Sequence, residues 1–169
     1  MAKITLHPEP LTGLAFAPFG DVVAIGERDA ILINDGNTER FDSLAKVESC
    51  GEQASVAINI FRAQARQLPM AIHMMERHPL GSQSFHPLSG EPYLVLVANP
   101  VEVLTPEDLK LFLAQPDQGI NYHRNTWHHP VLALNKTCDF LVVDRKGQGK
   151  NCEEFHFDRD TKIEIALSS

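Results

Sequence analysis

The sequence has few cysteines and few basic residues, and each shortage excludes a class of protein. Its 3 cysteines form neither a CxxC pair nor an even set, which argues against a disulfide scaffold and predicts free thiols. Lys and Arg number 15 against 22 Asp and Glu, so the formal net charge is −7. Because no cluster of basic residues offsets this charge, we expect neither nucleic acid nor an anionic membrane surface as a partner.

Long apolar runs are also missing. No apolar stretch reaches the roughly 18 residues of a transmembrane helix, and Met1–His7 has no apolar segment of the secretory type. We therefore expect a cytoplasmic protein. The sequence shows no repeat of solenoid length and no low-complexity tract, so residues 1–169 are predicted to form one domain.

Short apolar runs separated by Gly, Pro, Asn or Asp make up most of the chain. Two runs are clear strand candidates: residues 56–61, where Val56, Ile58 and Ile60 alternate with other side chains, and the almost wholly apolar Tyr93–Ala98. Further strands are expected at 122–134, 138–144, 152–157 and 161–167. This spacing predicts an all-β sandwich or barrel.

One short helix is expected to begin after Thr105. The threonine supplies an N-cap hydroxyl, Pro106 suits the first helical position, and two acids follow. An apolar stripe then continues through Leu109, Phe112 and Leu113.

Several ligand-type side chains lie on a predicted hairpin at residues 73–92, with its turn at 79–82. If residues 73–78 form a strand, Glu76 and His78 lie on one face because side chains alternate with a period of two. Across the turn, Gln83 reaches the same place. The spacing therefore predicts three converging polar groups.

A second polar stretch, GINYHRNTWHHP at residues 119–130, carries three histidines. In a regular strand His128 shares a face with Tyr122 and Arg124, whereas a bulge would bring Trp127 and His129 to that face. Imidazole and carboxylate suit Zn, Ni, Fe, Mn or Co, and the spacing leaves the choice of metal open.

Two motifs connect these residues to a known superfamily. Glu76-x-His78-x4-Gln83-x6-Gly90 has the spacing of the first cupin motif, HxHx4Ex6G, and His128 matches the last histidine of the second motif. The strings ERHPLGSQSFHPL, PYLVLVA and GINYHRNTWHHPVLAL, with FGDVVA and FLVVDR, resemble the ureidoglycolate lyase family, formerly called ureidoglycolate hydrolases. The resemblance spans nearly the whole chain.

This resemblance implies a homodimeric cupin with a jelly-roll barrel that cleaves (S)-ureidoglycolate into glyoxylate and urea in allantoin catabolism. It also implies a divalent metal, with Ni²⁺ as the family's suggested ion, and the ligand set Glu76, His78, Gln83 and His128. One Glu, two His and one Gln form a less basic set than three His and one Glu, so we expect weaker metal binding than in a typical cupin.

The reaction requires a base, an acid and a cation for the substrate carboxylate. His128 or Glu76 is the expected base, and Tyr122 is expected to orient or protonate the urea side. Arg124 or Arg62 is expected to bind the carboxylate through paired hydrogen bonds.

Three other functions remain open from the sequence. An amidohydrolase would release ammonia and carbon dioxide from the same substrate instead of urea. A non-catalytic cupin would bind a small carboxylate, and a metal-dependent oxygenase would consume oxygen.

Overall fold

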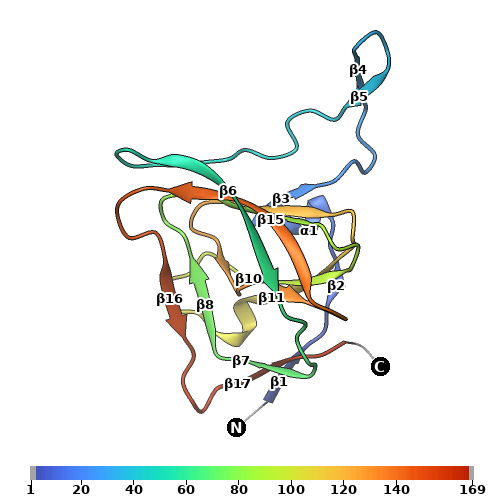
Figure 1. Ribbon diagram of the computed structural model, residues 1–169. Helices are drawn as coiled ribbons and strands as arrows, with labels where there is room; N and C mark the ends of the chain where they lie inside the picture. Colours follow the sequence, from blue (N-terminus) through green and yellow to red (C-terminus); the bar gives the residue numbers. More distant parts are fainter. Residues whose placement is uncertain (1–2, 168–169) are drawn as a thin grey trace.

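The computed structural model describes residues 3–167, and these residues are almost entirely β-structure (Figure 1). Two main sheets form the body of the barrel, a small sheet lies near the chain ends, and a two-stranded hairpin projects away from the rest. The expected all-β, cupin-like barrel is confirmed. Within the described residues, no helix combines the length and apolar character needed to cross a lipid bilayer.

Four sheets are formed by hydrogen-bonded strands. The five-stranded sheet has the order β3 (Gly20–Val23), β12 (Gly119–Tyr122), β9 (Gln83–Pro87), β15 (Cys138–Lys146) and β6 (Ser55–Ala63). The seven-stranded sheet has the order β16 (Glu153–His156), β8 (Met74–Arg77), β13 (Trp127–His128), β10 (Tyr93–Ala98), β11 (Leu109–Ala114) and β2 (Glu9–Pro10), and β14 (Leu132–Ala133) also pairs with β10. The three-stranded sheet has the order β1 (Lys3–Leu6), β17 (Lys162–Ile165) and β7 (Met70–Ile72), and the projecting hairpin consists of β4 (Ile31–Ile33) and β5 (Thr38–Arg40).

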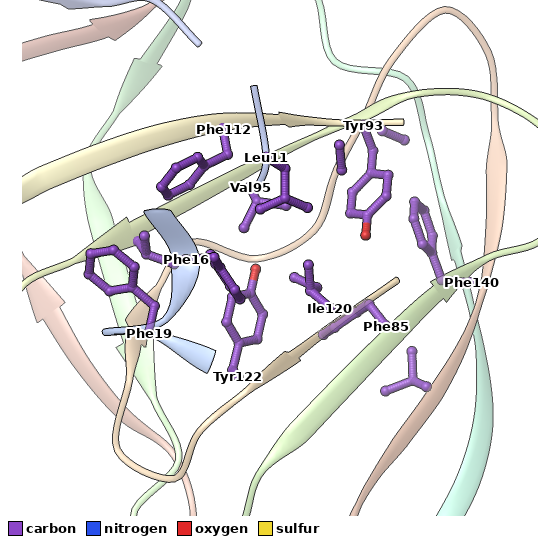
Figure 2. Packing of buried hydrophobic residues seen from close by; sticks show 14 of the residues in the cluster. Leu11, Phe16, Phe19, Phe85, Tyr93, Val95, Phe112, Ile120, Tyr122 and Phe140 are labelled. Atoms are coloured by element: carbon purple, nitrogen blue, oxygen red, sulfur yellow. The ribbon is translucent and has the colours of Figure 1, made fainter. Parts of the chain in front are cut away.

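Aromatic side chains fill the space between the two main sheets (Figure 2). The rings of Tyr93 and Phe140 meet edge to face with centroids 5.2 Å apart. The short helix α1 (Gly13–Phe16) is capped by the Thr12 hydroxyl and buries Phe16 edge-on against Phe112 at 5.7 Å. Such edge-to-face pairs add stability beyond the apolar area that they bury.

The strand β10 is apolar throughout because both of its faces are covered. Tyr93, Val95 and Val97 belong to the cluster between the main sheets. Leu94, Leu96 and Ala98 belong to a second cluster that includes Ile72 and Ile163 of the three-stranded sheet. A strand buried on both faces loses the alternation of apolar and polar residues.

The prediction of a helix after Thr105 is wrong beyond the first turn. Residues Pro106–Asp108 form a single 3-10 turn, in which the Thr105 N–H and hydroxyl both donate to Asp108 at 2.9 and 2.8 Å. Residues 109–114 then form β11, which pairs along its whole length with β10. Burial of Leu111 on one face and Phe112 on the other stabilises the strand over the helix that the local pattern favoured.

The long strand expected at residues 122–134 is divided into β12, β13 and β14. Asn125, with a φ of 69°, makes a turn between β12 and β13, and its N–H donates to the His78 carbonyl at 3.0 Å. This turn moves the chain from one main sheet to the other. The strands expected at 56–61, 93–98, 138–144, 152–157 and 161–167 are confirmed, with small changes at their ends.

The edge strand β6 presents an unusual outer surface. Val56, Ile58 and Ile60 are 50%, 72% and 57% exposed, whereas Ala57 and Asn59, which point the other way, are half-buried. The β4–β5 hairpin, which projects from the body of the barrel (Figure 1), also exposes Ile31 and Leu32. Apolar side chains therefore cover parts of the surface where polar ones are usual.

Candidate active site

Two neighbouring strands bring the central acid and histidine together. Glu76 on β8 lies directly opposite His128 on β13, and His78 follows the end of β8. Glu76 Oε1 lies 3.5 Å from His128 Nε2 and 3.9 Å from His78 Nε2. One ligand atom from each of these three residues lies within 4.8 Å of the other two. Glu76 and His78 thus lie together as the spacing predicted, and His128 joins them from the neighbouring strand.

Main-chain carbonyls fix the orientation of both imidazoles. His78 Nδ1 lies 2.6 Å from the Asn151 carbonyl oxygen, and His128 Nδ1 lies 2.9 Å from that of Thr126. A carbonyl oxygen only accepts, so each Nδ1 carries the proton and each Nε2 of the neutral ring keeps a free lone pair. Both Nε2 atoms are buried without a hydrogen-bond partner.

Gln83 adds a fourth polar group. Its Nε2 donates to Asp144 at 3.2 Å, and its Oε1 is buried without a partner. A pocket on this side of the barrel is lined by His78, Ser82, Gln83, Asp144, Asn151 and Cys152. Cys152, which lines this pocket, also approaches Glu76 Oε2 at 3.9 Å, so the cluster borders the pocket.

The histidines hold Glu76 in its ionised form. Burial acts to raise the pKa of Glu76, but the contact with His128 and the electrostatic interactions with the neighbouring imidazoles outweigh it, so the pKa lies below its ordinary value. Burial, aided by the nearby His128, lowers the pKa of His78. A carboxylate and a neutral imidazole are the protonation states that bind metals.

Tyr122 contacts the cluster through its ring. The ring stacks on His128 with centroids 4.1 Å apart and planes 13° from parallel. Its hydroxyl lies within the aromatic core, near Phe16 (Figure 2). Burial raises the pKa of Tyr122 well above its ordinary value, so this hydroxyl stays protonated.

The residues present fit a divalent metal ion. Glu76, His78 and His128 form a group that can hold one. Two buried imidazole nitrogens and one amide oxygen face no protein partner, which is costly unless a cation or water meets them. Hydrogen bonds from the Nδ1 atoms to carbonyls are the usual support of metal-binding histidines.

Comparison of the sequence with known proteins identifies the family of this chain. The model of the family described as ureidoglycolate lyase matches residues 3–164. The chain belongs to the ureidoglycolate lyase family. A ureidoglycolate lyase of Rhizobium etli (strain CIAT 652) is 56% identical over 153 residues, which cover 90% of this chain and 92% of that protein. One from Pseudomonas fluorescens (strain Pf0-1) is 49% identical over 162 residues, covering 96% and 97%.

Arg62, one of the two arginines predicted to bind the substrate carboxylate in this ureidoglycolate lyase family member, lies away from the cluster. It belongs to the outer face of the five-stranded sheet, where its guanidinium pairs with Asp139 at 2.7 and 3.0 Å. Asp139 is five positions from Asp144 along β15, a distance of about 17 Å at ~3.4 Å per residue. An odd number of positions also puts the two side chains on opposite faces.

Arg124 lies closer, on the turn between β12 and β13. Its guanidinium contacts Cys50 Sγ at 2.9 Å, and the side chain is exposed. The next residue, Asn125, donates its N–H to the His78 carbonyl. The structure therefore places Arg124 beside the segment that carries the cluster, without a contact to the cluster itself.

Sequence reasoning missed three residues of this site: Asp144, Asn151 and Cys152. Asp144 is the first charged residue after the apolar run FLVV of β15, a signal that would have marked it. Asn151 contacts His78 through its backbone carbonyl, and its side-chain Oδ1 accepts from the Leu80 N–H at 2.8 Å. Cys152 reaches the pocket only because β16 pairs with β8.

Proposed function

We propose that this protein cleaves ureidoglycolate into glyoxylate and urea. Membership of the ureidoglycolate lyase family supports this activity. The observation that carries the proposal is the Glu76 carboxylate lying beside two buried imidazoles whose Nε2 atoms have no protein partner.

The reaction requires proton transfer but consumes no water. Ureidoglycolate carries a hydroxyl and a urea nitrogen on the same carbon. When the hydroxyl proton is removed, the C=O bond of glyoxylate forms and the C–N bond breaks. The departing urea nitrogen must then receive one proton, so a single group that takes and returns a proton completes the reaction.

Glu76 is our choice for this group. Its lowered pKa keeps the carboxylate ionised and ready to accept the hydroxyl proton, and its protonated form is then a good donor to the urea nitrogen. Oε1 lies beside the imidazoles, while Oε2 lies toward Cys152 at the pocket. The two oxygens of one carboxylate thereby serve ligand binding and proton transfer.

We propose that His78, His128, Gln83 and Glu76 hold a divalent metal, with Ni²⁺ as the ion to test first. When bound, such an ion lowers the pKa of an oxygen that it contacts and attracts a carboxylate. In this arrangement His128 uses its Nε2 for the metal and holds the site rather than acting as the base. The Tyr122 ring supports His128 from behind.

We propose Arg124 as the cation that binds the substrate carboxylate. Its side chain is exposed and lies beside the His78 segment, and its present contact with a thiol is readily exchanged. A guanidinium binds a carboxylate with two parallel hydrogen bonds.

The experiment that tests this function is product analysis with racemic ureidoglycolate. We expect glyoxylate and urea in equal amounts, no ammonia, and consumption of only one enantiomer. Release of ammonia would identify an amidohydrolase, and oxygen uptake would identify an oxygenase. Binding of the substrate without turnover would identify a non-catalytic carboxylate-binding protein.

We also propose that two copies of the chain associate through the outer surface of β6 and the β4–β5 hairpin. Exposed apolar patches of this kind mark association sites, and the long edge strand β6 otherwise lies open to aggregation. Light scattering after size exclusion should give a dimer for the unchanged protein and for Val103→Lys, whose side chain is equally exposed elsewhere. Ile58→Lys combined with Ile60→Lys should give a monomer, and a monomeric unchanged protein would overturn the proposal.

The cytoplasm is the proposed location. All 3 cysteines of the chain are free thiols in the structure, which suits a reducing compartment. Fractionation of cells that produce the protein, with a periplasmic and a cytoplasmic marker, tests this location directly.

A further inference from the structure

Gln83 has one end of its side chain bonded and the other end free. The residue is 7% exposed, and its Nε2 donates to Asp144 Oδ2 at 3.2 Å. Its Oε1 is buried and has no hydrogen-bond partner. A buried carbonyl oxygen without a hydrogen-bond partner costs free energy unless a donor, a water molecule or a cation meets it.

Asp144 determines which end is free. The two residues lie directly opposite each other on β9 and β15, so they share a face of the sheet. Asp144 receives a second hydrogen bond, from Asn59 Nδ2 to Oδ1 at 3.0 Å. An ionised carboxylate only accepts hydrogen bonds, so it selects the NH₂ end of Gln83 and turns the carbonyl oxygen away.

The free oxygen belongs to the same group of atoms as the histidine nitrogens. Within residues 3–167, four buried side-chain nitrogen or oxygen atoms lack a partner, namely His78 Nε2, Gln83 Oε1, Asn121 Oδ1 and His128 Nε2. Gln83 lines the same pocket as His78 and Asp144. Two unpaired imidazole nitrogens thus lie beside Glu76, and the unpaired oxygen of Gln83 belongs to a residue that lines the same pocket as His78; such a set of free acceptors is the pattern that a cation requires.

We propose that Asp144 is a positioning residue that presents the Gln83 carbonyl oxygen, and not its NH₂ group, to the metal site. This inference rests on the metal site of the proposed function. Asp144 itself stays out of the ligand set. Because an amide has one oxygen and a carboxylate has two, a Gln ligand needs this orientation whereas a Glu ligand would not.

The first test is binding of Ni²⁺ to the metal-free protein by calorimetry, which needs no substrate. In Asp144→Asn the residue at 144 can donate as well as accept, so the Gln83 amide is free to turn and Ni²⁺ affinity should fall about 10- to 100-fold. Asp139→Asn, on the same strand but the outer face, is the matched control and should bind like the unchanged protein. Thermal unfolding of each variant reports whether the fold is kept.

A double variant separates orientation from a general structural effect. Gln83→Glu combined with Asp144→Asn reverses the donor and acceptor, keeps the hydrogen bond, and offers an oxygen in either orientation, so Ni²⁺ affinity should return to within about threefold. Gln83→Glu alone puts two carboxylates opposite each other and should bind less tightly than the double variant. Unchanged affinity in Asp144→Asn, or no recovery in the double variant, would overturn the proposal.

A second readout requires no metal. In NMR spectra of the metal-free protein, the Gln83 Nε2 protons should show stronger NOEs to the Asn59 amide than to the His78 imidazole. In Asp144→Asn, the NOEs to His78 should become the stronger ones. If the unchanged protein already shows stronger NOEs to His78, Asp144 does not orient the amide. If Ni²⁺ fails to bind while this pattern holds, the metal site of the proposed function is wrong and the orienting role of Asp144 stands.

Discussion

The ring of Tyr122 lies flat on the imidazole of His128, with centroids 4.1 Å apart and planes 13° from parallel. The two residues come from β12 and β13, which belong to different sheets. The stack therefore joins the two halves of the barrel at the position of the candidate active site. It also separates two roles for Tyr122, because the ring contacts the site and the hydroxyl points into the aromatic core (Figure 2).

Tyr122→Phe should keep lyase activity within about threefold of the unchanged protein, because the stacked ring remains. Tyr122→Leu removes a contact worth about 0.5–1.5 kcal/mol and should lower both kcat and the free energy of unfolding. Steady-state kinetics and urea unfolding of the two variants measure these effects. A large loss of kcat in Tyr122→Phe would instead support the phenol as a proton donor.

Glu76→Gln should lower kcat by about 10²–10⁴-fold, since the amide has nearly the same shape but accepts no proton. Ni²⁺ binding should fall less than kcat, because the amide still offers an oxygen. Glu102→Gln, at a side chain that is 85% exposed, is the control and should leave kcat unchanged. Near-normal turnover by Glu76→Gln would remove Glu76 from the reaction.

His78→Ala and His128→Ala should each lower Ni²⁺ affinity by at least about tenfold, because each removes a nitrogen that no protein group pairs. His123→Ala is the matched control, since His123 lies in the same histidine-rich stretch but is exposed and pairs with Asp21 at 3.2 Å. Calorimetry on metal-free protein measures binding.

A chelator should abolish lyase activity, and added Ni²⁺ or Mn²⁺ should restore it. Activity that persists in the presence of the chelator would exclude a required metal.

Arg124→Ala should raise KM for ureidoglycolate by about 10-fold or more, as expected for the loss of a charge-assisted hydrogen-bond pair. Arg62→Ala should leave KM unchanged, because that guanidinium pairs with Asp139 on the outer face of the sheet. The two variants lose the same charge, so the comparison separates a local contact from a general electrostatic effect. The reverse pattern of KM values would point to the outer face as the substrate site.

The free energy of unfolding should fall as pH is lowered from about 7.5 to 5.5. Burial lowers the pKa of His78, His86 and His129 in the folded protein, so the unfolded state binds more protons as pH falls through about 6.5. Carboxyl groups with a lowered pKa, such as Glu76, take up protons only below about pH 5.5, so they do not change the free energy of unfolding between about pH 7.5 and 5.5.

Urea unfolding at the two pH values measures this dependence. His86→Gln should weaken it, whereas His156→Gln, at an exposed ring outside the sheets' interior, should not. An unfolding free energy that rises toward pH 5.5 would contradict the assignment of neutral buried histidines.

The sequence was sufficient to predict the centre of the site because its spacing is local. Glu76 and His78 share a strand face, and a short turn returns the chain to Gln83. The partner strand of β8 was less predictable, since a turn at Asn125 in the left-handed region interrupts the expected strand before His128. Residue alternation alone gives no account of such a turn.

Long-range pairing explains the other differences. The stretch after Thr105 has the composition of a helix, but six residues of β11 pair with β10 and bury both faces. Arg62 was a reasonable carboxylate ligand by residue type, and only the register of β6 on β15 shows that it faces outward. Asp144 and Asn151 reach the site through contacts 61 and 73 positions distant in sequence, which no local pattern encodes.

Both site histidines receive their tautomer from peptide carbonyls, at Thr126 and Asn151. A peptide carbonyl is present whichever amino acid occupies the position, so point mutation at residue 126 or 151 leaves the acceptor in place. The proton arrangement that frees both Nε2 atoms is therefore encoded by the path of the backbone. The side chains at these positions help to hold that path, since the Thr126 hydroxyl donates to the Phe19 carbonyl and Asn151 Oδ1 accepts from the Leu80 N–H, both at 2.8 Å, so a substitution at either position should reach the histidines only by shifting the backbone.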